Sequence, residues 1–395
     1  MTRILLRAPK DPFLAASPRR TLRADLMGGD VGRLLAAQAV HRLLWTRDAE
    51  VVTARSIGGR GAAERLNAEF DHVVLPLGTA IGPLAGERLD ALAEAVEALR
   101  VPVTVIGLGA RLPVSGSAER LAPVRPAVVR LLRAVLDRSS SVGVAGELTA
   151  RYLRGLGFRD VEAVGDPSLL FREPPSALRV PARLTADSAI AIGLEPGTAA
   201  FDALAARQVA FFPRLRRVEQ SAHALERLLA ARRGSRRQDP ATSILVDPTP
   251  WVQHMASYDY AFGSRFSGVA AALLAGTPAT LLAADGAALE AARCFDVPVR
   301  TAHRTTERTD AQSLLDEGDW SAFLARLPRR LEAAGAFLAR NSLASVQDPG
   351  EDRTRFDRRA AAVAYPGDVS GAAPPRRAVP PAGERTGRIE PAAAA

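Results

Sequence analysis

The sequence predicts an α/β protein built from two doubly wound, Rossmann-like domains, and three observations carry this prediction. Short apolar runs of strand length alternate with longer segments that have helical apolar spacing, which is typical of parallel βαβ units. The runs are apolar throughout, as expected of strands that helices cover on both faces. A Pro-rich stretch over residues 172–188 divides the alternation into two series, and 395 residues suffice for two domains.

The first domain is predicted over residues 1–171. Helices are expected where apolar residues recur every three or four positions, and strands where short apolar runs stand alone. The expected strands lie at 3–6, 50–53, 72–77, 101–107, 140–144 and 161–164, and the expected helices at 33–45, 87–99, 123–136 and 147–156.

The second domain is predicted over residues 189–345, after a linker at 172–188. From residue 346 the apolar periodicity is lost, and the Pro/Ala/Arg-rich tail 346–395 is predicted to be disordered. Ligands of doubly wound sheets bind at the carboxyl ends of strands, so a site is expected in the cleft between the domains. The expected strands lie at 189–194, 208–212, 243–246, 259–262 and 279–283, and the expected helices at 218–233, 267–275, 286–294 and 319–340.

Composition excludes several classes of protein. A hydrophobic fraction of 47% and a charged fraction of 24% indicate a globular chain. Its single cysteine, Cys294, rules out an internal disulfide framework and favours the reducing cytoplasm; we interpret it as a small buried hydrophobe. No apolar run is long enough for a signal peptide or a transmembrane helix. Neither the histidines nor Cys294 show metal-ligand spacing, so no metal is expected.

Charge is unevenly distributed along this chain of net charge +9. Between Arg214 and Arg237 the sequence carries eight arginines and two glutamates. Such a patch could contact an anionic membrane surface, although we interpret it as a solvated Arg-rich helix. Because no aromatic residues are interleaved with the arginines, nucleic-acid binding is not expected.

The segment Asp259–Pro298 holds the strongest candidate site. Arg265 stands at an expected helix start, with Ser267 and Gly268 immediately after it. A helix N-terminus favours an anion, and arginine adds a planar fork of donors for carboxylate or phosphate. Asp285 follows the next expected strand and would face the same cleft. The segment therefore predicts a site for a small anionic ligand.

Two further glycine-rich segments are candidates for ligand contact. Gly28, Gly29, Asp30 and Gly32 precede an expected helix, where the backbone could approach a substrate, or where a plain turn could be capped by Asp30. Gly107 and Gly109 end an expected strand and could line the cleft or form a tight turn. The spacing GGDVG is not a dinucleotide fingerprint, so no cofactor is expected.

Several ordered segments resemble one family, the polysaccharide pyruvyl transferases. The likeness rests on GGDVGRLLAAQAVHRLL, HVVLPLGTAIGP, VPVTVIGLGARLP, residues 140–171 and Asp259–Pro298. The resemblance implies a fold similar to the two-domain GT-B glycosyltransferases. It also implies transfer of a pyruvyl ketal from phosphoenolpyruvate to a sugar of a bacterial cell-surface polysaccharide or its precursor. The substrates would be phosphoenolpyruvate and a glycan acceptor.

Two residues depart from the family pattern. The family motif is Arg, a hydrophobic residue, His, Gly, and here Ser267 replaces the histidine; Ala145 stands where the middle signature carries arginine. Arg265 would still hold the donor, Ser267 would hydrogen-bond it, and His254 is the nearest replacement for the acid/base group. Three outcomes stay open: an active pyruvyl transferase, a GT-B glycosyltransferase using a nucleotide-sugar, and a non-catalytic glycan or anion binder.

Overall fold

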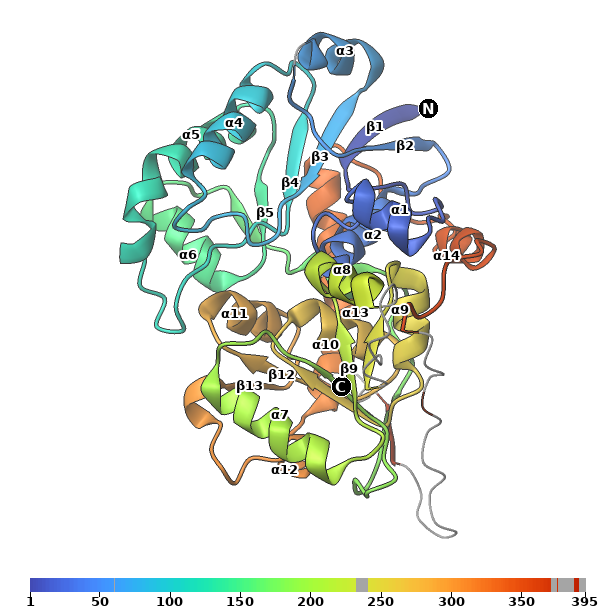
Figure 1. The fold of residues 1–395 in the computed structure, drawn as a ribbon. Coiled ribbons are helices and arrows are strands. Elements are labelled where there is room, and N and C mark those ends of the chain that lie inside the picture. Colours follow the sequence, from blue (N-terminus) through green and yellow to red (C-terminus); the bar gives the residue numbers. More distant parts are fainter. Residues whose placement is uncertain (60, 232–240, 371–374, 376–386, 391–395) are drawn as a thin grey trace.

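The computed structural model describes residues 1–59, 61–231, 241–370, 375 and 387–390. Two parallel sheets dominate it, one formed by the first part of the chain and one by the later part (Figure 1). Helices flank each sheet, and the loops that connect strands to helices carry the candidate site.

The first sheet has the strand order β2-β1-β3-β4, and all its pairs are parallel. A parallel bridge from Leu108 to Val144 extends it to the pair β5-β6. Its order reverses between β1 and β3, which makes a topological switch point. The strands are β1 (Thr2–Arg7), β2 (Ala49–Ala54), β3 (His72–Pro76), β4 (Val103–Ile106), β5 (Val142–Val144) and β6 (Val161–Ala163). The helices are α1 (Pro18–Arg23), α2 (Val31–Leu44), α3 (Ala62–Glu69), α4 (Gly86–Glu97), η1 (Glu119–Val124), α5 (Arg125–Leu136), α6 (Glu147–Gly155) and η2 (Pro167–Leu170).

The second sheet has the order β10-β9-β8-β11-β12-β13 with all pairs parallel. Counted from β8, this is the Rossmann order 3-2-1-4-5-6, with its switch point between β8 and β11. The strands are β8 (Ile190–Gly193), β9 (Arg216–Glu219), β10 (Thr242–Ile244), β11 (Tyr260–Gly263), β12 (Ala279–Ala283) and β13 (Val299–Thr301). The helices are α7 (Ala199–Phe211), α8 (Ala222–Ala231), α9 (Pro248–Met255), α10 (Phe266–Leu274), α11 (Gly286–Cys294), η3 (Ala302–Arg304) and α12 (Ala311–Asp316).

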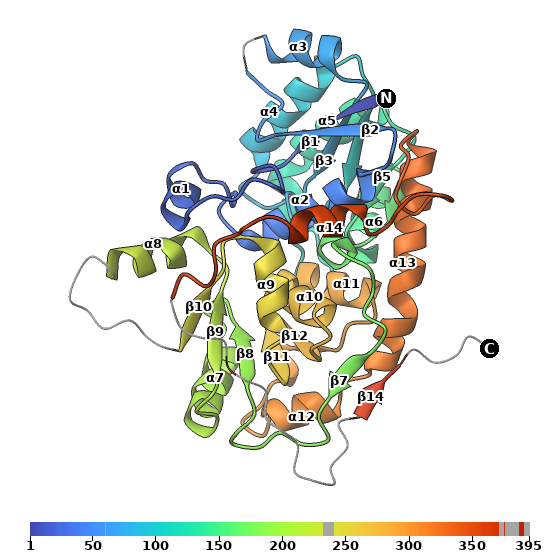
Figure 2. The same ribbon diagram turned by 90° about the vertical axis from the view of Figure 1, so that its right-hand side faces the viewer.

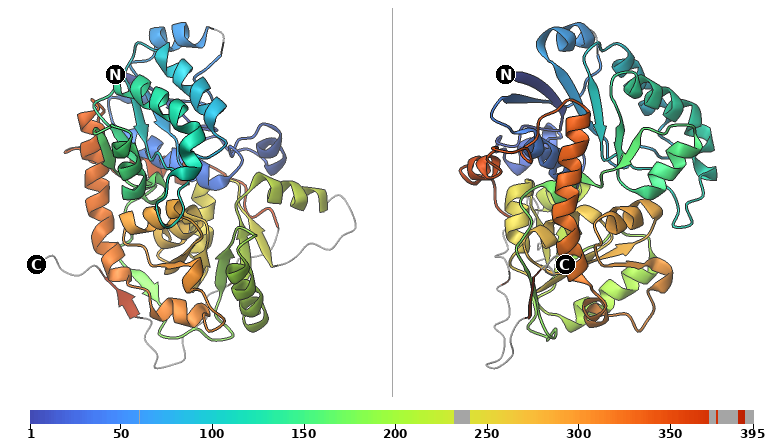
Figure 3. Two further views of the ribbon diagram at one scale, coloured as in Figure 1. Left: turned by 90° about the vertical axis from the view of Figure 1, so that its left-hand side faces the viewer. Right: turned by 180° about the vertical axis from the view of Figure 1, so that it is seen from behind.

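Two helices join the sheets. Helix α2 contacts η2, α9 and α10, and its buried Leu35 and Leu43 belong to one apolar core that also contains Ile192 and Phe262 of the second sheet. Helix α13 (Trp320–Arg340) runs along the molecule from the second sheet to the first (Figures 2 and 3). The Arg340 end of α13 forms an ion pair with Glu162 of β6.

The segment after α13 returns to the first half of the protein. Helix α14 (Arg355–Ala361) inserts Phe356 between the rings of Phe13, His41 and Trp45, and Figure 2 shows it crossing in front of α2. The strand β14 (Gly387–Ile389) pairs antiparallel with β7 (Leu178–Val180) inside the predicted linker. Disorder over 346–370 is therefore a wrong prediction, because buried Val346, Phe356 and Val369 anchor this segment. Residues 371–374, 376–386 and 391–395 lie outside the described residues.

Two other element predictions in the second sheet are wrong. The apolar run 208–212 belongs to α7, in which Phe201, Leu204, Ala205 and Gln208 are buried at helical spacing. The strand instead is β9, a short charged segment at the start of the predicted helix 218–233. The predicted fold class is confirmed: the chain is α/β, with two parallel, Rossmann-like sheets.

Candidate functional site

A cleft of about 580 Å³ lies between the carboxyl edges of the two sheets. Its walls come from the segments that follow β1, β3 and β4 on one side and β8, β11 and β12 on the other. Both switch points thus open into one cavity, whose volume is typical of a small-molecule site. A cleft is therefore present where the ligand site was predicted, and ligand binding there stays a prediction.

The switch point of the second sheet places the Arg265 loop in the cleft. Gly193 and Gly263 end β8 and β11, and a Cβ on Gly263 would lie 3.2 Å from the carbonyl carbon of Gly193. The chain turns at once, and the Ser264 hydroxyl accepts a hydrogen bond from the Glu195 amide at 2.7 Å. Arg265 then occupies the N-cap of α10.

Arg265 forms ion pairs with two carboxylates. One is Asp30 from the first half of the chain, and the other is the exposed Glu195, 3.0 Å from Arg265 Nη2. Asp30 caps α2 by accepting from the Gly32 amide at 2.6 Å. Burial raises the pKa of Asp30, while the Arg265 guanidinium opposes that rise. The positive charge of Arg265, the residue predicted to hold the donor, is therefore already balanced by carboxylates. The ion pair of Arg265 with Asp30 links the two halves of the chain.

The neighbour of Ser267 is an amide. The Ser267 hydroxyl donates to Gln220 Oε1 at 2.8 Å, and Gln220 is 2% exposed. Gly268 leaves room for this glutamine, since a Cβ there would lie 3.5 Å from the Gln220 carboxamide carbon, with Nε2 closer still. A carboxamide neither accepts nor releases a proton near neutral pH. The Ser267 hydroxyl thus donates to an amide rather than to a base.

His254 lies apart from the residues described as lining the cleft. It belongs to α9, is buried, and has Nε2 3.0 Å from the Tyr258 hydroxyl. Burial lowers the pKa of His254. The geometry gives no support to its predicted acid/base role.

The predicted glycines divide into two groups. Gly28, Gly32 and Gly107 line the cleft, whereas Gly29, Gly109 and Gly268 are not among the described lining residues. Gly28 and Gly29 have φ of 64° and 86° and form the turn before α2, as the turn interpretation expects. Gly32 has a packing role, because a Cβ on it would lie 2.7 Å from Ser267 Cβ.

Three carboxyl groups line the cleft: Asp285 and Glu290 lie at the start of α11 and within it, and Asp166 follows β6. Asp285 caps α11 by accepting from the Ala288 amide at 2.9 Å. Glu290 accepts from the Thr149 amide at 2.8 Å and the Thr149 hydroxyl at 2.6 Å. Asp166 caps η2 by accepting from the Ser168 amide at 2.9 Å. Burial raises the pKa of both Asp166 and Glu290.

Four arginines that line the cleft were not predicted from the sequence. Arg7 is the last residue of β1, Arg33 and Arg88 lie in the first turns of α2 and α4, and Arg111 follows β4. All four line the cleft. The sequence contains one feature that all four share: each arginine lies near the carboxyl end of an expected strand or near the start of the next helix.

Other predicted features lie outside the cleft. In the described part of the Arg214–Arg237 patch, Arg216 and Arg217 belong to β9 and Arg227 to α8. Cys294 is buried, and burial raises the pKa of its thiol to about 11. Arg232, Arg233, Arg236 and Arg237 lie outside the described residues.

Two absences hold for the part of the chain that the structure describes. No helix in it is long and apolar enough to cross a membrane. Nor does it contain a group of three His, Cys, Asp or Glu side chains able to hold a metal ion.

Two parallel sheets with a cleft between their carboxyl edges define an α/β protein of the doubly wound class. The model of the family described as "Polysaccharide pyruvyl transferase" matches residues 71–286, more than half of the chain. The protein belongs to this family of transferases. A search of curated proteins finds no match to the chain.

Three solved structures are weakly similar to the protein, two of them with UDP or UDP-GlcNAc. MnaA of S. aureus, in a UDP co-structure, has a TM-score of 0.42 and 11% identity, covering 91% of this chain and 94% of that chain. UDP-GlcNAc 2-epimerase from Neisseria meningitidis, bound to UDP-GlcNAc, has a TM-score of 0.41 and 11% identity, covering 91% and 99%. The glycotransferase of kitacinnamycin has a TM-score of 0.38 and 14% identity, covering 86% and 97%. None of these likenesses is strong enough to indicate a substrate.

Proposed function

We propose that the protein transfers a pyruvyl group from phosphoenolpyruvate to two hydroxyls of a sugar in a cell-surface polysaccharide or its precursor, in the cytoplasm. Membership of the pyruvyl transferase family supports this proposal. The observation that carries it is the cleft at two facing switch points, with the family's motif arginine, Arg265, on one wall.

The reaction forms two C–O bonds and breaks one. Both sugar hydroxyls bond to C2 of the enolpyruvyl unit, and the C2–O bond to phosphate breaks. One hydroxyl proton ends on C3, which becomes a methyl group, and the other leaves with the phosphate. A group that exchanges protons near neutral pH is therefore needed beside the reacting carbon.

Asp166 is our candidate for the proton-exchanging group. It lines the cleft, it is only half-buried, and burial raises its pKa. Glu290 also lines the cleft, but both of its carboxylate oxygens bond Thr149. Ser267, held by Gln220, would position the donor by hydrogen bonding.

Arg265 would bind the donor carboxylate by exchange of partners. Its contact with Glu195 is with a side chain that is 59% exposed, and such surface pairs contribute about 0–1 kcal/mol. The donor carboxylate can replace Glu195 at little cost, while the pair with Asp30 stays in place.

The test measures phosphate release from phosphoenolpyruvate over a panel of glycans with neighbouring free hydroxyls, together with the ketal methyl signal of the product. Asp166→Asn keeps the side-chain shape but cannot ionise, so we expect kcat to fall about 100-fold or more with phosphoenolpyruvate binding retained. Asp319→Asn, at the N-cap of α13 outside the cleft, is the matched control.

A non-catalytic binder is the second candidate, because an amide rather than a base faces Ser267. Binding of phosphoenolpyruvate without phosphate release over the whole panel would select this candidate. Absence of phosphoenolpyruvate binding, with a nucleotide-sugar stabilising the protein, would instead select a nucleotide-sugar transferase.

A further inference from the structure

Three arginines converge on the wall of the cleft that belongs to the first sheet. Arg7 lies at the carboxyl end of β1, and Arg33 and Arg88 lie in the first turns of α2 and α4. The switch point between β1 and β3 is the place where doubly wound sheets bind ligands. The three side chains thus meet where the topology of the first sheet predicts a site of its own.

None of these arginines contacts an acidic side chain directly in the described part of the chain, although the charge of Arg33 acts on the pKa of Asp30. Among the residues the structure describes, Arg7, Arg33 and Arg88 form no ion pair, and their side chains make only long contacts: Arg33 to the Gly28 carbonyl at 3.4 Å and Arg88 to the Ala80 carbonyl at 3.5 Å. The nearby Asp30 is bonded to Arg265.

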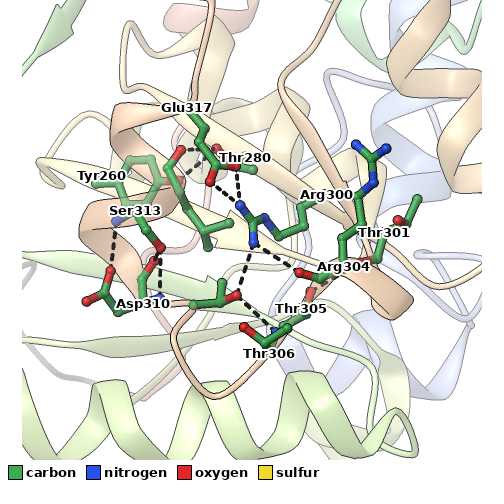
Figure 4. A network of polar contacts seen from close by, with 12 residues as sticks. Tyr260, Thr280, Arg300, Thr301, Arg304, Thr305, Thr306, Asp310, Ser313 and Glu317 are labelled. Carbon is green, nitrogen blue, oxygen red and sulfur yellow. Dashed lines mark hydrogen bonds and ion pairs between the residues drawn. The ribbon is translucent and has the colours of Figure 1, made fainter.

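Two arginines outside the cleft, Arg300 and Arg42, have acidic partners. Arg300 pairs with the Glu317 carboxylate and donates to the Thr309 hydroxyl and the Arg304 carbonyl, each at 3.1 Å (Figure 4). Buried Arg42 likewise pairs with Glu173 and Asp357. The bare cations of the cleft wall therefore differ from arginines that stabilise the fold.

The three charges repel one another. Arg7 is half-buried, and burial, followed by the charges of Arg88 and Arg33, lowers the pKa of its guanidinium. Arginine stays protonated at neutral pH all the same, so the positive charges and their mutual repulsion persist in the free protein. An anionic ligand would remove this cost.

We propose that Arg7, Arg33 and Arg88 form a binding subsite for a phosphate-bearing group with two or three negative charges. A phosphate or diphosphate offers several oxygens to planar guanidinium forks and balances the charge of the cluster. A single carboxylate would leave most of that charge unmatched. The group can belong to phosphoenolpyruvate or to a phosphate on the acceptor. The subsite goes beyond the proposed transfer reaction, since anion binding does not require turnover.

Calorimetric titration of the full chain tests the subsite with three probes: inorganic phosphate, phosphoenolpyruvate and UDP. We expect Arg7→Gln, Arg33→Gln and Arg88→Gln each to raise the Kd of the bound probe about tenfold or more, the loss of one charge-assisted hydrogen bond. Arg133→Gln removes an exposed arginine of α5 that lies outside the cleft lining, and it should leave every Kd unchanged. Affinity for phosphoenolpyruvate over UDP assigns the subsite to the donor, and the reverse preference assigns it to a diphosphate.

Thermal stability without ligand gives a second readout. Because Arg7→Gln relieves repulsion, its melting temperature should equal or exceed that of the wild type. If Arg7→Gln has a lower melting temperature and an unchanged Kd for all three probes, Arg7 is a structural residue and the proposal is overturned. An equal rise in Kd in the control Arg133→Gln would also overturn it. Phosphate binding that depends on the three arginines, without phosphate release from phosphoenolpyruvate, would uphold the subsite and reject the transfer reaction.

Discussion

Replacing His41 by phenylalanine should make the protein resistant to acid. His41 lies near the end of α2, 1% exposed, among the rings of Phe13, Trp45 and Phe356. Neither ring nitrogen has a hydrogen-bond partner among the described residues. Burial, followed by the charge of Arg359, lowers its pKa from 6.5 to about 3. The folded protein therefore holds this imidazole neutral.

The sign and size of the effect follow from linkage. Below pH 6.5 the unfolded chain binds a proton at this histidine that the folded chain does not bind, so stability is lost as the pH falls towards 3. At about 1.4 kcal/mol per unit, the gap between the two pKa values amounts to about 5 kcal/mol. If α14 opens locally, His41 can be protonated without global unfolding, so the loss of stability cannot exceed the free energy of that opening. His72, whose pKa burial lowers to about 4, adds a separate loss.

Urea unfolding midpoints measured between about pH 7 and pH 4 give the assay, because carboxylate and histidine linkage both act in that window. Wild type should lose stability steadily, and His41→Phe should lose several kcal/mol less over the same range. His223→Phe, at an exposed position of α8, is the control and should follow the wild type. If His41→Phe and wild type lose stability in parallel, the buried neutral imidazole is not the cause and the reasoning fails.

Two further predictions concern contacts between the halves of the chain. The side chains of Lys10 and Asp247 form a fully buried ion pair. Lys10→Met leaves the Asp247 carboxylate without this partner, which should lower the free energy of unfolding by about 3–5 kcal/mol. The double variant Lys10→Met/Asp247→Asn should recover most of this loss, measured by urea unfolding. Gly32→Ala brings a Cβ to 2.7 Å from Ser267 Cβ, which should cost about 1–3 kcal/mol by overpacking. A double-mutant cycle with Ser267→Gly should show recovery of at least about 1 kcal/mol, and simple additivity would contradict the steric explanation.

The sequence predicted the site's location better than its chemistry. Alternating strands and helices were enough to place Arg265 and Asp285 at the mouth of one cleft, because the carboxyl ends of parallel strands share an edge. The ion pair of Arg265 with Asp30 joins residues 235 positions apart, and no local pattern encodes such a contact. The same holds for Gln220, which meets Ser267 only because β9 precedes it.

Local patterns also failed where tertiary contacts decide. The strand β9 has the sequence RRVE and one buried residue, Val218. It therefore shows neither the apolar–polar alternation nor the apolar run from which a strand is predicted. Helix α14 lies in a segment of low periodicity, and the aromatic pocket around Phe356 holds it in place. Arg7 directly follows the first expected strand, residues 3–6, and the rule that predicted a site after β11 applies to it equally.

The buried pair of Lys10 and Asp247 has a practical consequence. Lys10 is the only lysine of the sequence, and its side chain is fully covered in the folded protein. Amine-reactive dyes, crosslinkers and resins therefore find no lysine side chain on the native surface. Modification of Lys10 by such a reagent reports that the N-terminal loop has separated from α9, which makes the residue a built-in chemical probe of inter-domain opening.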